Sequence, residues 1–140
     1  MGRSRGGLTT KIHLLASGTH TGFAFRIGPG HAHDAPAGRA LVSQTVLSRK
    51  TKIVMDKGYA DNKTRTSLRE HGYVPVVPPK RNARKPWKYA KKLYRQRNEI
   101  ERLFHHLKNF RRIATRYDKL DLTFSSFVAL ALSIIYLNIC

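Results

Sequence analysis

The sequence has little cysteine, few acidic residues and no long hydrophobic run. Its single cysteine, Cys140, is the last residue, which excludes an internal disulfide and favours a reducing cytoplasm. The apolar segment 124–138 contains serines and falls short of the ~20 residues that cross a bilayer, so it predicts a buried core helix. Because the first residues also lack the apolar stretch of a secretory signal, we expect a cytoplasmic protein with no membrane partner.

Acidic residues are scarce against a large excess of basic ones. Asp and Glu number 8 against 27 Lys and Arg, which gives a formal net charge of +19. With 41% hydrophobic residues, the 140-residue chain has enough apolar material for one core, which excludes a disordered basic tail. A charge of this size requires a polyanionic partner, and nucleic acid is the first candidate because phosphate neutralisation releases counterions.

The order of apolar runs and turn residues predicts an α/β fold, because strands and helices alternate along the chain. We expect the following elements: a hairpin at about 8–27, strands at about 52–56 and 73–77, and helices at about 93–110 and 122–138. Two shorter helices are also expected, one beginning with Asp34 as its N-cap and one ending at Gly72.

Residues 80–92 are dense in cations and contain Trp87, which predicts a mobile loop before the helix at 93–110. Trp87 has two interpretations that the sequence leaves open. It could stack on or wedge between bases, as aromatic residues in basic loops do, or it could anchor the loop to the domain.

The predicted helix at 93–110 has two distinct sides. Apolar residues at i, i+3, i+4 and i+7 form the stripe expected to face the core: Ile100, Leu103, Phe104 and Leu107. On a wheel of ~100° per residue a neighbouring side gathers Tyr94, Arg97, Glu101 and Lys108. The simplest interpretation of that side is a solvated face with Glu101 paired to Arg97 and His105, each pair worth only ~0.3 to 0.5 kcal/mol.

The spacing Tyr94-x2-Arg97-x3-Glu101-x6-Lys108 supports a second interpretation. It resembles the Y-R-E-K signature of DDE transposases from bacterial insertion sequences, of the insertion-sequence-four and insertion-sequence-five groups. The segment "DKGY" at residues 56–59 is similar to the one that carries the second catalytic aspartate of that family. Further segments match the same group in wording and order: "GRSRGGLTTKIH", "GHAHDAP", "VPPKRN" and "FRRIATRYDK".

The resemblance implies a ribonuclease-H-like mixed sheet flanked by helices, on which Asp, Asp and Glu hold two Mg²⁺ or Mn²⁺ ions. Asp56 would be the second aspartate and Glu101 the glutamate, although an aspartate in this position is also an ordinary turn residue. Carboxylate oxygens are ligands that such hard metals prefer. The residues expected to contact DNA are Tyr94, Arg97, Lys108, Lys57, Lys80, Arg81, Arg84, Arg111 and Arg112.

One part of the family pattern is not matched. The first catalytic aspartate of the family lies on a central strand upstream of the segment that matches "GRSRGGLTTKIH", so we expect this chain to be the C-terminal part of the catalytic domain. Three explanations are open: the downstream frame of a frameshifted transposase, a decayed remnant, or a start assigned too late. The expected partners are double-stranded DNA of the element ends and target, an upstream-frame product or full-length transposase, and further copies in an oligomer.

Two other functions are compatible with the charge. The chain could be a non-catalytic DNA-binding remnant or regulator derived from a transposase. It could also be an RNA-binding protein of the ribosomal kind, although that function would leave the Glu101 face and "MDKGY" without a role.

Overall fold

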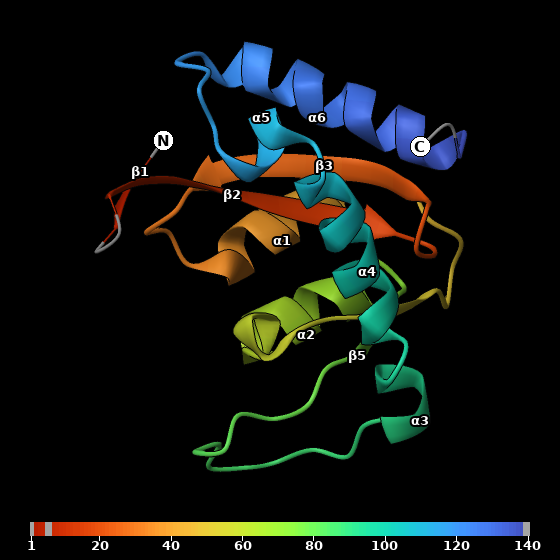
Figure 1. Cartoon of the computed structure of the whole chain (residues 1–140). Coiled ribbons are helices and arrows are strands. Elements are labelled where there is room, and N and C mark those ends of the chain that lie inside the picture. The colour runs from red at the N-terminus through yellow and green to blue at the C-terminus, as the bar shows by residue number, and fades with distance from the viewer. Residues whose placement is uncertain (1, 5–6, 139–140) are drawn as a thin grey trace. The chain divides into compact units, whose positions relative to one another are not determined.

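The computed structural model describes residues 2–4 and 7–138, and its elements are labelled in Figure 1. The chain divides into two compact units. Unit 1 combines residues 1–32 with residues 98–140, and unit 2 comprises His33–Arg97. Cys140, for which no thiol chemistry is expected, lies outside the described residues.

Unit 1 contains an antiparallel sheet in the order β1-β2-β3, formed by β1 (Gly2–Ser4), β2 (Gly7–Ala16) and β3 (Gly22–Pro29). β2 and β3 pair along most of their length, with a register shift at Leu15/Ala16. A side chain at Gly22 would place its Cβ only 2.7 Å from Leu132, so β3 begins where the sheet approaches a helix closely. The pairing of β1 is a finding that the basic, glycine-rich opening of the sequence did not predict.

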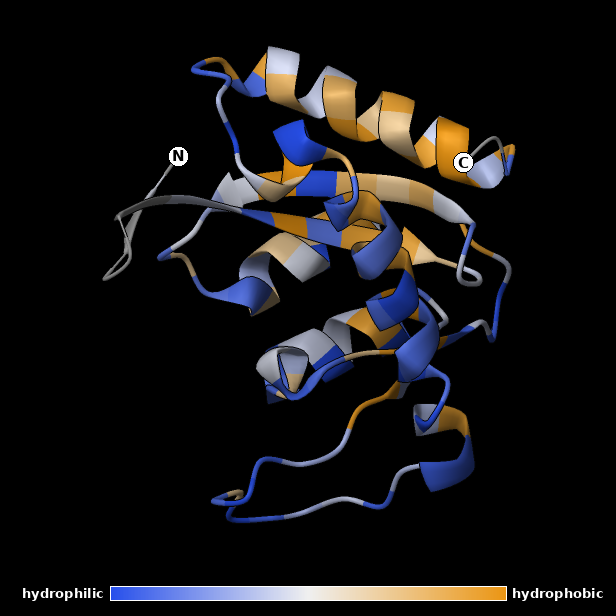
Figure 2. Ribbon diagram, viewed as in Figure 1, coloured by the Kyte–Doolittle hydropathy of each residue, from blue (hydrophilic) through white to orange (hydrophobic). Residues whose placement is uncertain are grey.

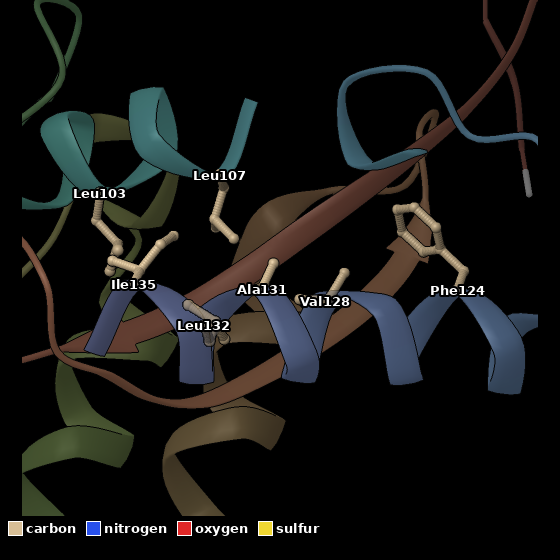
Figure 3. Close-up of a cluster of buried hydrophobic side chains, with 7 residues drawn as sticks. All are labelled: Leu103, Leu107, Phe124, Val128, Ala131, Leu132 and Ile135. Carbon is tan, nitrogen blue, oxygen red and sulfur yellow. The ribbon is translucent and has the colours of Figure 1, made fainter. Parts of the chain in front are cut away.

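Three helices complete unit 1: α4 (Arg97–Lys108), α5 (Arg111–Ala114) and α6 (Asp121–Tyr136). A hydrophobic cluster joins α4 to α6, and Figure 3 shows its buried side chains: Leu103, Leu107, Phe124, Val128, Ala131, Leu132 and Ile135. Ile100 and Phe104 of α4 pack against this cluster and are partly buried. The predicted apolar stripe of this helix is therefore confirmed.

The C-terminal apolar segment is confirmed as a core helix. α6 buries a residue on nearly every turn, from Phe124 to Ile135. Among the described residues, every helix is too short or too polar to reach across a bilayer.

Arg116 ties the start of α6 to the sheet of unit 1. Its side chain is only 7% exposed, and its guanidinium donates to the carbonyl oxygen of Asp118 at 2.8 Å and to the hydroxyl of Thr10 at 2.9 Å. It also forms an ion pair with the carboxylate of Asp121 at 2.6 Å, and this hydrogen bond lowers the pKa of Asp121. The buried Arg116 side chain thus links the segment before α6 to β2 and to the first turn of the helix.

Unit 2 contains α1 (Asp34–Ser43), β4 (Lys52–Val54), η1 (Lys57–Tyr59), α2 (Asn62–Glu70), β5 (Val74–Val76) and α3 (Lys91–Tyr94). β4 and β5 pair in parallel, and η1 and α2 lie on the connection between them, as a parallel pair requires. Both strands are short, and the buried residues Ile53 and Val76 come from them.

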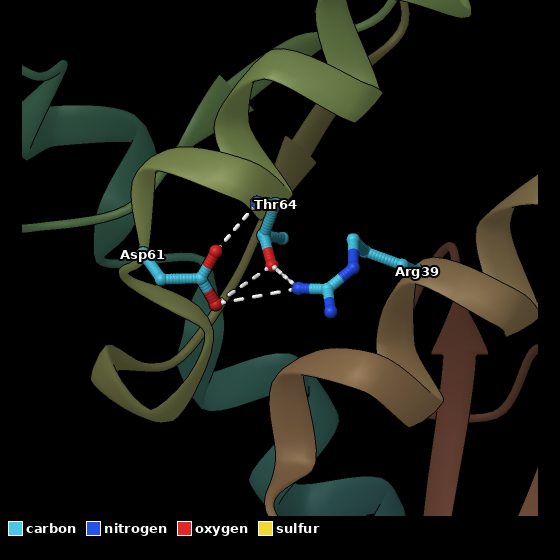
Figure 4. A network of polar contacts seen from close by, with 3 residues as sticks. All are labelled: Arg39, Asp61 and Thr64. Atoms are coloured by element: carbon cyan, nitrogen blue, oxygen red, sulfur yellow. Dashed lines mark hydrogen bonds and ion pairs between the residues drawn. The ribbon is translucent and has the colours of Figure 1, made fainter.

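A polar network holds the start of α2 against α1, as Figure 4 shows. Asp61 is the N-cap of α2 and accepts from the backbone N–H of Thr64 at 2.6 Å. Arg39 of α1 donates to the hydroxyl of Thr64 at 2.8 Å and lies 3.5 Å from the Asp61 carboxylate. α2 is closed by Gly72, which has a positive φ of 79°, as the sequence predicts.

The resemblance implies a mixed sheet that is incomplete because its central first strand is missing. The described residues form an antiparallel sheet in unit 1 and a parallel pair in unit 2. The hairpin pairs neighbouring strands, whereas β4 and β5 pair across a helical connection, so separate parts of the chain form the two sheets. The α/β class itself is confirmed.

The helix expected at 93–110 is interrupted. α3 ends at Tyr94 and α4 begins at Arg97, with a two-residue turn between them in which Gln96 donates to the carbonyl oxygen of Leu93. The backbone N–H of Arg95 still donates to the carbonyl oxygen of Lys91 at 3.3 Å, so the break follows Arg95. Tyr94 and Glu101 therefore lie on different helices.

Candidate functional site

Asp56 lies two residues beyond the end of β4, at the start of η1. It caps η1: its Oδ1 accepts from the backbone N–H of Lys57 at 2.7 Å. The side chain is nevertheless 61% exposed, so the carboxylate is held at one atom and open to solvent. This arrangement satisfies both sequence interpretations, because a turn aspartate is also available to a ligand.

Arg97 forms an ion pair with Asp56 in unit 2. Its Nη1 lies 4.0 Å from Oδ1 of Asp56, and its guanidinium carbon lies 5.9 Å from the centre of the Tyr94 ring. Tyr94 in turn meets Tyr89 edge to face at 5.7 Å. A pair at 4.0 Å on a partly exposed surface contributes only ~0 to 1 kcal/mol, so its value lies in placing positive charge beside the carboxylate.

The turn that carries Asp56 packs against α1. The ring of Tyr59 packs so closely on Gly38 that a Cβ there would lie 2.5 Å from the ring. At Gly58, an added Cβ would lie 2.9 Å from the carboxylate of Asp34. Asp34 is therefore not the N-cap that the sequence predicts, since His33 occupies that position and Asp34 is the first helical residue, facing the turn.

The pKa of the Tyr59 phenol reflects this packing. Burial raises the pKa of Tyr59 to about 12, and the charges of Asp34 and then Asp56 add to the rise. The phenol is thus a protonated donor at neutral pH, close to both carboxylates.

Replacement of Asp34 by asparagine is expected to lower the pKa of Tyr59 from about 12 while burial keeps it above the ordinary value of 10.0. The pKa of Tyr59 is raised only in the folded chain. The contribution of Tyr59 to stability is therefore fully present below pH 10 and is lost as the pH rises toward 12. Ultraviolet titration of tyrosinate, taken as the difference from Tyr59→Phe, measures the shift. Asp56→Asn should lower the pKa of Tyr59 by a smaller amount. An unchanged pKa of Tyr59 in Asp34→Asn would contradict the packing of the Asp56 turn against α1.

Glu101 lies in the part of α4 that belongs to unit 1, and its side chain is exposed. Arg97, Glu101 and Lys108 fall within about 40° of one another around α4, at ~100° per residue. Their common side is distinct from the stripe that buries Leu103 and Leu107. Asp56 belongs to unit 2, whereas Glu101 belongs to unit 1.

The remaining predicted DNA-contacting residues are cations on the surface. Lys57, Lys80, Arg81 and Arg84 of unit 2 are exposed, as are Lys108 and Arg111 of unit 1. Arg112 is more constrained, because its guanidinium donates to Asp118 at 3.1 Å and lies 4.1 Å from the centre of the Phe127 ring. Its position is therefore set largely by the protein's own contacts.

The donor set fits a divalent hard cation in kind. Asp56 and Glu101 offer exposed carboxylate oxygens, which Mg²⁺ and Mn²⁺ prefer, and the nearby cations are guanidinium and ammonium groups that do not compete as ligands. Within the part of the chain that the structure describes, three or more His, Cys, Asp or Glu side chains do not come together as a metal-binding group.

Sequence reasoning missed Asp34, Gly38 and Tyr59 as parts of this site. A glycine inside a predicted helix was the available signal, since Gly38 disfavours helix unless another group must approach closely. The partner that approaches it, Tyr59, is distant in sequence and could not be named from the pattern.

Comparison with known proteins gives two matches. The family model described as "Transposase DDE domain" matches residues 2–136. A relative from Brucella ovis, named "Putative transposase for insertion sequence element IS6501", is 30% identical over 136 residues, covering 94% of this chain and 100% of that protein. No solved structure matches the chain. The chain therefore belongs to the family of insertion-sequence transposases with a DDE domain.

Proposed function

We propose that this chain is the C-terminal part of a transposase catalytic domain of ribonuclease-H-like fold, which cleaves DNA and transfers the cut strand. Asp56 and Glu101 would hold Mg²⁺ or Mn²⁺. The observation that carries the proposal is the exposed Asp56 carboxylate, fixed by its own turn and lying 4.0 Å from Arg97, which begins the helix that bears Glu101. By its resemblance, this transposase would belong to the insertion-sequence-four and insertion-sequence-five groups.

The chemistry divides between the metal and the protein. Bound metal would activate water or a 3′-hydroxyl and stabilise the leaving oxygen. Arg97 and Lys108, on the Glu101 side of α4, would bind the phosphates and hold the strand against the carboxylates. Tyr94 supports the Arg97 guanidinium through its ring.

The two carboxylates need a third ligand. In the family, an aspartate upstream of the segment matched by residues 2–13 completes the set, and nothing in the described residues groups three acidic side chains for it. On the family resemblance, we propose that the first aspartate is supplied by another polypeptide, either an upstream-frame product or a full-length transposase that joins this chain.

A second candidate function is sequence-independent DNA binding without cleavage, by a remnant or regulator. It is favoured by the net charge of +19 and by the exposed cations of both units. On this candidate, DNA binding would fall steeply with salt and no strand would be cut.

A nicking assay separates the two functions. The chain is tested alone and joined to the coding segment that precedes it, on a supercoiled plasmid with and without Mg²⁺. The proposal expects metal-dependent nicking only by the joined protein. If the joined protein carries the upstream aspartate, binds DNA and still leaves the plasmid intact, the catalytic function is wrong and the binding function stands.

A further inference from the structure

The stretch between Glu70 and Glu99 contains no acidic residue, and its cations gather after β5 and in α3. Figure 2 shows the loop between β5 and α3 in the hydrophilic colour over most of its length. The cations of this stretch that are exposed are Lys80, Arg81, Arg84, Lys85, Lys88, Lys91, Lys92 and Arg95. Since the stretch contains no carboxylate to neutralise them, it carries a strong local excess of positive charge.

The loop is tied together at its base. It leaves the sheet at Val77, which is fully buried, and returns at Trp87, whose indole Nε1 donates to the Val77 carbonyl oxygen at 2.8 Å. A turn inside it is closed by the N–H of Ala83, which donates to Lys80 at 3.0 Å. Loops of this length whose ends meet are compact Ω-type loops rather than mobile linkers.

The Trp87 ring is also used within the protein. The guanidinium carbon of Arg65, on α2, lies 3.7 Å from the centre of the ring. A contact of this type contributes ~0.5 to 2 kcal/mol. With its N–H bonded to Val77 and one face covered by Arg65, Trp87 anchors the loop, which favours the second of the two interpretations of this residue.

We infer that residues 78–88 form a preshaped basic arm that binds the phosphate backbone of duplex DNA, with Trp87 as its positioning residue. The inference rests on the proposed role in transposition and adds a surface apart from Asp56 and Glu101. The arm would hold DNA without reading its sequence, because phosphate contacts fix position and carry no base information.

The loop's architecture suits this partner. Lys80, Arg81, Arg84 and Lys85 lie between the two tied ends and are exposed, so each is accessible to a phosphate. Because the Trp87 contacts order the loop in advance, binding loses less conformational entropy than it would with a flexible tail.

The arm is tested with the whole 140-residue chain and a short duplex, by fluorescence anisotropy over a range of salt. Replacing Lys80, Arg81, Arg84 and Lys85 together by glutamine is expected to weaken binding at least about tenfold and to reduce the slope of log K against log salt by about 2 to 4. The matched control replaces four other exposed cations by glutamine: Arg49, Lys52, Lys63 and Lys119. Equal losses in the two variants would overturn the arm, because net charge alone would then explain binding.

The single tryptophan gives a second readout. If Trp87 anchors the arm, its fluorescence should stay nearly constant when duplex DNA is added, whereas strong quenching would show stacking on bases and overturn its role. Trp87→Phe keeps an aromatic ring for Arg65 but loses the N–H that bonds Val77, so it should weaken DNA binding less than Trp87→Ala does. Trp87→Ala should lower both the affinity and the salt slope, with circular dichroism confirming that it stays folded.

The nature of the partner is decided by competition. Hairpin RNA of equal length should displace the duplex less effectively than unlabelled DNA, and equal or better displacement would overturn the assignment to DNA. None of these measurements depends on cleavage. If the arm variant loses DNA binding as expected while the joined protein does not nick DNA, the proposed catalysis is refuted and the DNA-binding arm is still supported.

Discussion

Asparagine in place of Asp56, or glutamine in place of Glu101, should reduce Mg²⁺-dependent nicking by the joined transposase at least about 100-fold. A bound metal supplies several kcal/mol of transition-state stabilisation, and each 1.36 kcal/mol corresponds to about tenfold in rate. Both amides are close in size to the native side chains and remove the charge that a metal ligand requires.

The structure provides matched controls for both substitutions. Glu99 lies on α4 two residues before Glu101, on a different side of the helix, and pairs with Arg102 at 3.5 Å, so Glu99→Gln should leave nicking within about threefold. Glu70, exposed at the end of α2, serves in the same way for Asp56.

DNA binding is measured for each of these variants. It should be equal or slightly stronger in Asp56→Asn and Glu101→Gln, because the lost carboxylates repel phosphate rather than bind it. If Asp56→Asn nicks at the parental rate, Asp56 is an ordinary turn residue and the site must be sought elsewhere.

Truncation of Leu103 to alanine should lower the free energy of unfolding by about 2 to 5 kcal/mol. Leu103 is fully buried in the cluster that joins α4 to α6 and lies there with Leu132 and Ile135, as Figure 3 shows. Its removal leaves a cavity that neighbouring rigid elements can fill only in part. Since the same helix carries Arg97 and Lys108, the substitution should also reduce the fraction of chain able to bind DNA.

Leu122→Ala is the control, because Leu122 lies on α6 and is 79% exposed. Its effect should stay within about 0.5 kcal/mol. Urea denaturation followed by circular dichroism compares the two variants, with an unchanged dependence on denaturant showing that both unfold alike. Equal stabilities for the two variants would mean that α4 and α6 do not share a core.

Local pattern was enough for several features. The spacing of Ile100, Leu103, Phe104 and Leu107 predicted which side of α4 is buried, because helix geometry converts a period of 3.6 into one face. Gly72 predicted the end of α2, because its positive φ suits glycine. The apolar composition of residues 124–138 likewise predicted a core helix.

Predictions failed where a neighbour distant in sequence decides the structure. Asp34 looks like a helix cap because caps are recognised locally, yet its carboxylate faces Gly58. The break before Arg97 was missed because hydrophobic periodicity marks a buried face and does not mark where a helix is interrupted. β1 was missed because strand pairing supplies hydrogen bonds that a three-residue segment cannot show by composition.

The sequence by itself determined the family, the charge and the buried side of each main helix, since motif spacing and hydrophobic periodicity are properties of the chain alone. Only the tertiary structure decided that α1 seats the Asp56 turn through Gly38 and Asp34, and that Trp87 closes the basic arm against Val77. Both depend on close contacts between residues far apart along the chain, and such contacts are selected by packing and hydrogen bonding once the elements have met.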